Sequence, residues 1–209
     1  MINILISFDD NDYELGEYFE KSYNGILERI LFYPGLNIAS IDGLNCTEQN
    51  INYHINAYSG DKFIFVGLSH GNEEELLTHN CVFVSASNNT SFNQSLFYTT
   101  ACSSGKKLGK SLIDNGCITY VGYDDEVGVQ ESYYDVFIKC ENYVLLKFLN
   151  QGISIKDAYD EMISFYNSEI DRLSLGTIND VIVAGYLTEN RDCLTLMGNS
   201  NLRIFDLIA

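Results

Sequence analysis

The amino-acid sequence predicts an α/β fold, with a mostly parallel central sheet flanked by helices on both faces. Apolar, β-prone segments alternate with segments in which apolar residues recur every three or four positions, which is typical of strands joined by crossover helices. A length of 209 residues suits one domain, taken here as residues 1–209, and a hydrophobic content of 46% supplies its core. A single proline and a charged content of 20% argue against long disordered linkers.

Five segments are predicted as the strands of the parallel sheet, because each is a short apolar run bounded by turn residues. In chain order they are 2–7, 36–41, 62–68, 96–101 and 117–123. Three segments near the C-terminus are predicted as further short strands: 181–187, 193–198 and 202–208. Between the third and fourth strands, residues 72–95 combine three glutamates with a polar Asn/Ser stretch, which indicates a hairpin or loop excursion.

Helical periodicity predicts the helices that connect these strands. Their ranges are 13–32, 48–58, 105–115, 131–150 and 154–170. Thr47 and Ser154 are suitable N-caps, because a hydroxyl at that position accepts a hydrogen bond from the first helical turn. Gly116 suits the end of the third helix, where glycine adopts a left-handed conformation without strain.

The chain is strongly acidic, with 29 Asp and Glu residues against 12 Lys and Arg residues and a net charge of −17. This balance argues against nucleic-acid binding, which depends on Lys and Arg at the phosphates, and against binding to anionic membranes. Two interpretations of the charge stay open: solubility through self-repulsion, and attraction of basic substrates. No apolar run has membrane-spanning length, and the segment MINILISFDD is typical of a first strand rather than of a signal peptide.

The six cysteines, at positions 46, 81, 102, 117, 140 and 193, show no CxxC or other metal-type spacing. Several lie in apolar, strand-like runs, as small buried hydrophobic residues do. This usage predicts a reducing, cytoplasmic location, and neither a metal nor another cofactor is expected.

A histidine and a cysteine follow two consecutive predicted strands. The segment FIFVGLSHG delivers His70 and Gly71, and the segment LFYTTACSSG delivers Cys102. Because functional sites of open α/β sheets form beyond the carboxyl ends of the strands, both side chains are expected at one edge. The pair has the chemistry of a thiol nucleophile with its acid–base partner, and the Gly71 and Cys102 N–H groups are candidate oxyanion donors. The helix predicted from residue 105 would lower the thiol pKa through its dipole. Each residue alone is more often a packing cysteine or a turn histidine.

The two motifs together resemble the caspase–gingipain group of cysteine peptidases, and most closely its gingipain branch and the CHAT proteases of bacteria. The resemblance rests on strand–Ser-His-Gly, on TTACSSGKKLGKSLIDNGCITYVGYDD and on the tail CLTLMGNSNLRIFD. It extends over about residues 2–207, and its specific motifs occupy about a quarter of the chain. In the tail, Gly198-Asn199-Ser200 lacks the Asp and Pro of that branch. Caspases proper have Gln where this chain has Thr100, which argues against their Asp-specific activity.

The resemblance implies a three-layer caspase-like sandwich and hydrolysis of a peptide bond through a Cys-His dyad. Cys102 would attack the scissile carbonyl, and His70, lying across the substrate, would protonate the leaving amine. The N–H groups of Gly71 and Cys102 would hold the oxyanion. A protein or peptide substrate is therefore expected, and an activating or regulatory protein is a further expected partner.

The resemblance also implies where the substrate side chain binds. In this group, the loop after the first strand and the strand before the nucleophile line the primary specificity pocket. Those positions hold the acidic run Asp9, Asp10 and Asp12 and, before the nucleophile, Thr100; the fifth strand ends in Asp124 and Asp125. An acidic pocket would prefer Arg or Lys before the cleaved bond. The alternative is a solvated acidic loop in an already acidic chain.

Two other function classes stay open from the sequence. A non-catalytic binding or scaffold module could use the same fold, although the His70 and Cys102 pair is intact. A flavodoxin-like ligand-binding domain would need a glycine-rich phosphate loop after the first strand, where this chain is acidic. The 72–95 excursion and the loop at 124–132 are expected to gate the site, because control commonly lies in loops beside it.

Overall fold

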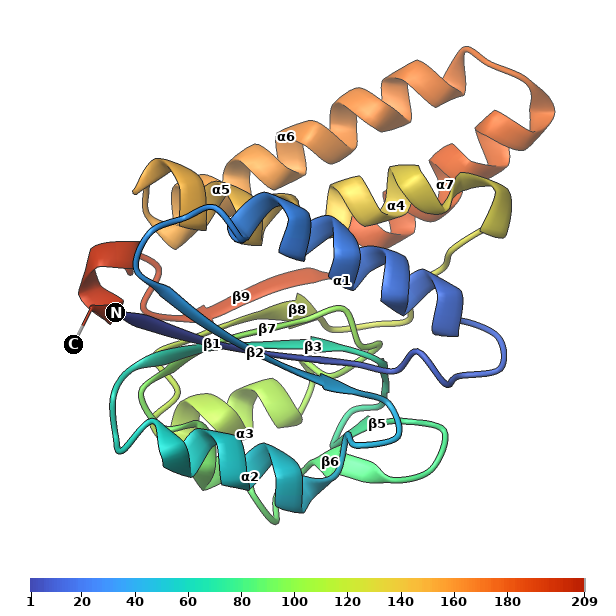
Figure 1. Ribbon diagram of the computed structural model, residues 1–209. Coiled ribbons are helices and arrows are strands. Elements are labelled where there is room, and N and C mark those ends of the chain that lie inside the picture. The colour runs from blue at the N-terminus through green and yellow to red at the C-terminus, as the bar shows by residue number, and fades with distance from the viewer. Residues whose placement is uncertain (209) are drawn as a thin grey trace.

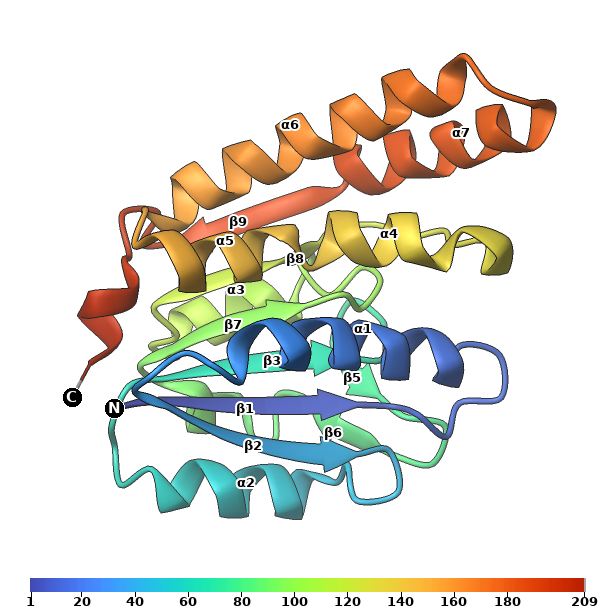
Figure 2. The same ribbon diagram turned by 45° about the horizontal axis from the view of Figure 1, so that its top comes forward.

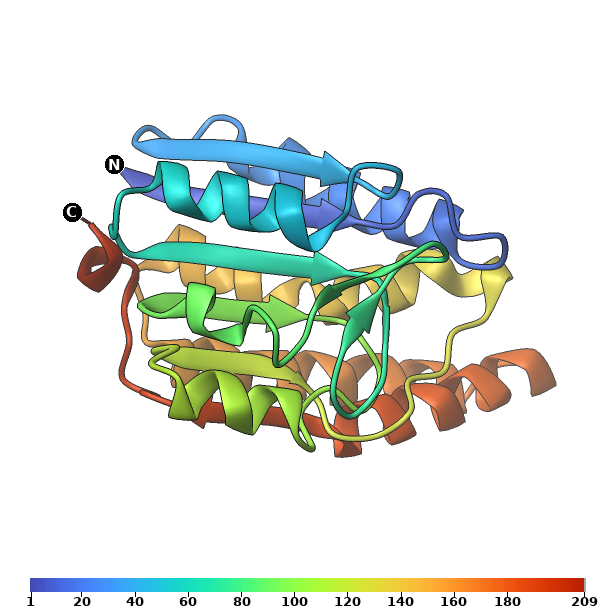
Figure 3. The ribbon, with the colours of Figure 1, turned by 90° about the horizontal axis from the view of Figure 1, so that it is seen from below.

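A six-stranded sheet in the order β2-β1-β3-β7-β8-β9 forms the centre of the molecule in the computed structural model, which describes residues 1–208. Helices cover both faces of this sheet, so the molecule has three layers (Figure 1). Five strands run parallel and β9 runs antiparallel to β8, at the edge of the sheet (Figure 3). The predicted α/β class and the mostly parallel sheet are confirmed.

The strands match the predicted segments closely. The parallel strands are β1 (Ile2–Phe8), β2 (Leu36–Asp42), β3 (Phe63–Leu68), β7 (Ser95–Thr99) and β8 (Thr119–Tyr123). The antiparallel strand β9 (Leu194–Gly198) lies within the predicted segment 193–198. The four central strands β1, β3, β7 and β8 are buried on both faces, as their continuous apolar runs predict.

One face of the sheet carries most of the helices (Figure 1). They are α1 (Gly16–Ile30), α4 (Tyr134–Glu141), α5 (Tyr143–Gln151), α6 (Ile155–Ser174) and α7 (Ile178–Asp192). The other face carries α2 (Glu48–Ala57) and α3 (Leu108–Asp114). Side chains alternate along each strand, so Ile4 and Ile6 join the core under α1, whereas Leu5 joins the core over α2 and α3.

The 72–95 excursion begins in a small antiparallel sheet beside the end of β3, which confirms the predicted hairpin. Its strands are β4 (His70–Gly71), β5 (Leu76–Leu77) and β6 (Val82–Val84), followed by a 3₁₀ turn at Asn89–Phe92. The excursion lies on the α2 and α3 side of the main sheet (Figure 3). The first strand of this small sheet, β4, directly precedes the excursion and contains His70, so the sheet fixes the backbone of a predicted site residue.

Both predicted N-caps are confirmed. The Thr47 hydroxyl accepts a hydrogen bond from the Asn50 N–H at 3.2 Å, and the Ser154 hydroxyl accepts one from the Asp157 N–H at 3.1 Å. The helix predicted over 131–150 is instead two helices that meet at Asn142. The Asn142 side chain is buried and donates to the Ser22 carbonyl of α1 at 3.0 Å, which ties α1 to this junction.

The prediction of a strand at residues 181–187 is wrong, because this segment forms the middle of α7. Thr177 and Asp180 make a capping box at the start of the helix, and its two local hydrogen bonds satisfy backbone N–H groups that the first helical turn leaves free. Residues of one helical face pack against the core: Val183, Ala184, Leu187 and Asn190. Tertiary packing therefore overrides the strand preference of the sequence VIVAGYL.

The last predicted strand, at residues 202–208, is also wrong. Ile204–Leu207 form a 3₁₀ helix, and burial of Ile204 and Leu207, three positions apart, suits that geometry. The Arg203 N–H donates to the Asp206 carboxylate at 2.8 Å and holds the turn closed. Helix α3 starts at Leu108 rather than at residue 105, because the residues before it form turns.

A buried carboxyl group lies at the junction between α4 and α5. Glu141 is 1% exposed, and neither of its carboxyl oxygens has a hydrogen-bond partner among residues 1–208. Four buried tyrosines of α1, β7, β8 and α6 are electrostatically coupled to it: Tyr18, Tyr98, Tyr123 and Tyr166. Burial raises the pKa of Glu141 to about 8, so the folded protein keeps this group protonated at neutral pH.

The Glu141→Gln variant tests this buried group. Between the ordinary Glu pKa near 4.5 and the raised pKa of about 8, the unfolded chain releases a proton that the folded chain retains. The contribution of Glu141 to the free energy of unfolding should therefore be largest below pH 4.5 and should fall as the pH rises to about 8. Urea unfolding at several pH values should show that Glu141→Gln removes this decline. The exposed Glu20→Gln variant should keep it, and parallel pH profiles of all three proteins would contradict the assignment.

Candidate active site

The pairing register of β3 and β7 places His70 and Cys102 at the same edge of the sheet. The last paired residues are Gly67 and Thr99. His70 follows Gly67 by three positions, and Cys102 follows Thr99 by three positions. Because neighbouring strands lie about 4.8 Å apart, the two segments leave the sheet side by side.

Side-chain contacts continue this alignment beyond the last ladder pair. The Thr99 hydroxyl donates to the Gly67 carbonyl at 2.8 Å, and the Thr100 N–H donates to the same carbonyl at 3.2 Å. A Cβ at Gly71 would lie 2.7 Å from the Cβ of Ala101, which leaves room only for glycine. The residue after His70 therefore touches the residue before Cys102.

Asp12 holds the imidazole of His70. The Asp12 Oδ2 atom lies 3.2 Å from the His70 Nε2 atom, and the Asp12 side chain is largely buried. Burial alone would raise the pKa of Asp12, but hydrogen bonds from the Leu15 and Glu14 N–H groups and the nearby His70 outweigh it, so the pKa lies below its ordinary value. The carboxylate is thus ionised and accepts from the histidine.

The His70 ring is also held by packing. The ring of Phe19 on α1 meets it edge-on at 5.6 Å between centroids. The side chain of His70 stays about one third exposed, so one side of the ring faces solvent. Sequence reasoning placed Asp12 in the acidic run after the first strand but did not assign it to His70, because that pairing depends on where α1 begins.

A loop at residues 124–130, here called the strap, lies against Cys102, which stays partly exposed. The Val127 N–H donates to the Cys102 Sγ atom at 3.3 Å. The Ser103 N–H donates to the Asp125 carbonyl at 2.9 Å, and Ser103 has a φ of 56°, a left-handed conformation that is uncommon for serine. The turn that carries the thiol is therefore fixed from both sides.

The predicted lowering of the Cys102 pKa by a helix dipole is wrong. Burial is the largest effect and raises the pKa of the thiol, the hydrogen bond from Val127 opposes it, and the carboxyl groups of Glu141 and Glu126 raise it further. Helix α3 begins only at Leu108, and a helix dipole acts within about one turn of its end. In this conformation the thiol is protonated at neutral pH and only partly exposed.

The two predicted oxyanion donors are available. The Cys102 N–H donates to no backbone carbonyl within residues 1–208. The Asn72 N–H donates to the Glu75 carbonyl at 3.0 Å, so Gly71 and Leu76 form the next, non-hydrogen-bonded pair of the hairpin. The Gly71 N–H therefore points away from β5.

The carboxylates after the first strand lie apart from Cys102. Asp9 is fully buried and accepts from the His79 N–H at 2.9 Å, and its Oδ1 atom has no partner within residues 1–208. Burial is the main reason why the pKa of Asp9 is raised. Asp10 is exposed and accepts from the Gly43 N–H at 2.9 Å, in the turn after β2. Both residues thus lie at the carboxyl edge of the sheet on the side of β2, with β3 between them and Cys102.

The remaining predicted pocket residues lie nearer to the thiol. Thr100 is buried beside the end of β3, and its hydroxyl has no partner within residues 1–208. Asp124 and Asp125 are exposed at the start of the strap, and the Asp125 carboxylate pairs with Lys106 at 3.2 Å. The predicted pocket residues therefore form two separate groups, with the end of β3 between them.

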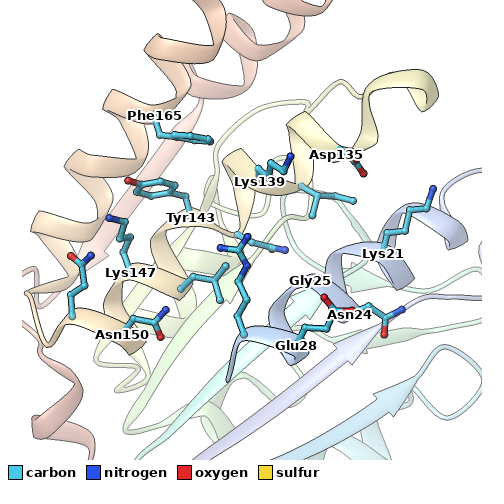
Figure 4. A pocket seen from close by; sticks show the side chains of 15 residues that line it. Lys21, Asn24, Gly25, Glu28, Asp135, Lys139, Tyr143, Lys147, Asn150 and Phe165 are labelled. Carbon is cyan, nitrogen blue, oxygen red and sulfur yellow. The ribbon is translucent and has the colours of Figure 1, made fainter. Parts of the chain in front are cut away.

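A cavity in the described part of the chain lies elsewhere, on the helical face. It has a volume of about 680 Å³ and runs between α1, the α4–α5 pair and α6, with Lys21, Lys139 and Tyr143 among its walls (Figure 4). None of the predicted site residues lines it. Within residues 1–208, no group of three or more His, Cys, Asp or Glu side chains is arranged to hold a metal ion. The same residues include no helix that is both long and apolar enough to span a bilayer.

The fold of this chain is similar to that of a solved cysteine proteinase. No protein-family model matches the chain, and no curated protein matches it in sequence. The chain superposes on the Arg-specific cysteine proteinase gingipain R with a TM-score of 0.65 and 13% sequence identity. The match covers 96% of this chain and 47% of the gingipain R chain, so the chain spans about half the length of that protein.

Two further solved structures show weaker similarity. They are an inactive zymogen C11 protease from Parabacteroides distasonis, with a TM-score of 0.42, and a secreted C11 cysteine protease from Bacteroides thetaiotaomicron, with a TM-score of 0.47. Both are 12% identical to this chain, and the matches cover 85% and 83% of it and 70% of each of those chains. The similarity to gingipain R confirms the predicted caspase-like fold.

The contact between the two site segments can be tested by a double-mutant cycle. Gly71→Ala forces a methyl group onto Ala101 and should destabilise the protein by about 1–3 kcal/mol. Ala101→Gly removes that methyl partner, so the double variant should lose less stability than the sum of the single variants, as measured by urea unfolding. Gly185→Ala is the control, because a Cβ there meets nothing within 4 Å and should stabilise helix α7. Strict additivity of Gly71→Ala and Ala101→Gly would contradict the contact.

Proposed function

We propose that this protein is a cysteine peptidase with Cys102 as nucleophile, His70 as acid–base residue and Asp12 as the carboxylate that orients His70. The observation that carries the proposal is the aligned edge, where the β3–β7 register brings the His70 and Cys102 segments together and Asp12 binds the histidine at 3.2 Å. A thiol, an imidazole and an ionised carboxylate in this order are the groups that acyl transfer requires.

In the proposed reaction, the Cys102 sulfur attacks the substrate carbonyl carbon after its proton has moved to the imidazole of His70. The Asp12 carboxylate, which bonds His70, stabilises the imidazolium that results. His70 then protonates the leaving amine and an acyl-enzyme forms, which water hydrolyses. The Gly71 and Cys102 N–H groups, which point away from the existing ladder, would stabilise the oxyanion.

The similarity of fold to gingipain R, described as an Arg-specific cysteine proteinase, supports a protein or peptide substrate. We further propose that one domain, residues 1–209, carries this activity. All six cysteines are unpaired, which supports the predicted reducing, cytoplasmic location.

A preference for Arg or Lys before the cleaved bond is proposed from the charge of the edge. Asp10, Asp124 and Asp125 are exposed there, and Asp9 has a buried carboxylate oxygen without a partner within residues 1–208. A substrate guanidinium or ammonium group would supply charge-assisted hydrogen bonds to such carboxylates.

The second candidate function is a non-catalytic binding or scaffold module. The observation that favours it is the resting state of Cys102, whose thiol is covered by Val127 and has a raised pKa. A thiol in this state is a poor nucleophile until the strap moves.

Fluorogenic peptides ending in Arg, Lys, Leu and Asp provide the direct test. The wild type should cleave at least one of them, and an acyloxymethyl-ketone probe should label Cys102. Cys102→Ala should abolish both signals, whereas Cys81→Ala, which removes another partly exposed thiol, should keep them. Absence of cleavage by a protein whose Cys102 is shown to be accessible would exclude the peptidase and favour the binding module.

Asp12→Asn should lower kcat by about 10²-fold and leave KM nearly unchanged, because the amide cannot stabilise the imidazolium of His70. Initial rates on the best peptide measure both constants. Asp12→Glu should recover part of kcat, and an unchanged kcat in Asp12→Asn would remove Asp12 from the proposed mechanism.

The charge preference is tested by the ratio of kcat/KM for Arg and Leu peptides. Asp9→Asn or Asp10→Asn should reduce this ratio at least about tenfold if the carboxylate contacts the substrate side chain. Asp114→Asn, at the end of α3, is the matched control and should leave it unchanged. Equal ratios in all variants, or faster cleavage of Asp peptides, would remove the proposed preference.

A further inference from the structure

The hairpin of α6 and α7 extends beyond the end of the sheet (Figures 1 and 2). Exposed apolar residues form one face of this hairpin. Leu175 is 90% exposed and Ile178 is 82% exposed. Val181, Ile182 and Tyr186 continue the same face of α7 and are each at least one third exposed. Positions 178, 182 and 186 recur every four residues, so they form one stripe along the helix.

This apolar face has no counterpart within the described chain. The opposite side of α7 packs on the core through Val183 and Leu187, so the helix is apolar on two sides. Gly185 lies in the middle of the exposed side, where a Cβ would meet nothing within 4 Å. Glycine lowers helix stability by about 1 kcal/mol, and no contact within residues 1–208 requires it here. An exposed apolar stripe of this kind is typical of an interaction site.

The charges around the stripe indicate what kind of partner fits. Glu189 is exposed on the stripe's own helix and Asp171 is exposed on the neighbouring helix α6, and Arg172 is neutralised by Glu169 at 2.6 Å. The whole chain has a net charge of −17, so a second copy would bring like charges together. A partner helix with an apolar face flanked by Lys or Arg complements both the stripe and its rim.

The inner end of the same stripe touches the strap over Cys102. The ring of Tyr186 packs against Gly128, where a Cβ would lie 2.8 Å from the ring. Asn190, one turn further along α7, is fully buried and clamps Gly128 from both sides, accepting from its N–H and donating to its carbonyl, each at 2.9 Å. Val127, the neighbour of Gly128, donates to the Cys102 thiol. A short chain of contacts therefore connects the exposed face to the nucleophile.

We propose that the apolar face of α7 is a docking surface for a basic amphipathic helix of a partner protein, and that docking moves the strap away from Cys102. Tyr186 belongs to both surfaces, because its ring contacts Gly128 and is 38% exposed, and in the proposal the partner draws this ring away from Gly128. The partner thus binds the open strap more tightly than the closed one, as a shift of this equilibrium requires. The consequence for peptidase activity rests on the function proposed above, but the exposure of Cys102 does not.

Docking is tested with a synthetic 15-residue helix of Leu and Lys labelled with fluorescein, and with the same peptide carrying Glu in place of Lys. The Leu/Lys peptide should bind the wild type, and Ile178→Gln/Ile182→Gln should weaken binding at least about tenfold. Phe32→Gln, which alters an equally exposed apolar residue elsewhere, should leave binding unchanged. Equal binding to all three proteins, or tighter binding of the Leu/Glu peptide, would overturn the docking surface. Concentration-dependent dimerisation that Ile178→Gln/Ile182→Gln abolishes would assign the face to a second copy instead.

Movement of the strap is tested by the rate at which iodoacetamide modifies Cys102, followed by mass spectrometry of its peptide. Saturating Leu/Lys peptide should raise this rate at least about fivefold in the wild type. Asn190→Ala and Tyr186→Ala should raise it without the peptide, and circular dichroism should show both variants folded. An unchanged rate in folded Tyr186→Ala and in the peptide complex would overturn the coupling. A raised rate without any peptide cleavage would support the docking surface and count against the peptidase.

Discussion

The parallel pairing of β3 with β7 is the constraint on which the rest of the site depends. It fixes Gly67 opposite Thr99, and every residue that leaves the sheet on these two strands inherits that alignment. His70 and Cys102 become neighbours because each follows its paired residue by the same number of positions. The contact between Gly71 and Ala101 carries the alignment past the last ladder bond. A shift of one residue would turn one of the two side chains to the other face of the sheet.

The candidate site combines an ordered Asp12–His70 pair with a partly buried cysteine, Cys102. Asp12 is ionised and bonds His70, and Phe19 packs against the ring, so the imidazole needs little reorganisation. Cys102, in contrast, is not ready to react. Burial raises the pKa of its thiol, and the sulfur accepts a hydrogen bond from the Val127 N–H. The Asp12–His70 part of the site is therefore preorganised, whereas the reactivity of Cys102 depends, in the proposal above, on movement of the strap.

Helix α7 connects this loop to the surface. Its inner side contributes to the core and its buried Asn190 holds the strap, whereas its outer side exposes an apolar stripe that ends at Tyr186. The contacts of Tyr186 and Asn190 with Gly128 are the physical link through which docking on the stripe is proposed to move the strap.

The sequence alone determined the α/β class, the five parallel strands, two helix caps and the pair His70 and Cys102. These features depend on local patterns, since burial on both faces produces continuous apolar runs and strand ends expose the residues that follow them. Tertiary structure decided the rest. The segment 181–187 has β-branched residues but is helical because the Thr177 capping box and core packing outweigh its propensity. Three features of the site join residues that are 25 to 62 positions apart in the sequence. They are the Asp12–His70 pair, the contact of Val127 with the Cys102 thiol, and the hydrogen bonds of Asn190 to the strap. Only folding sets such distances, so no local pattern encodes them.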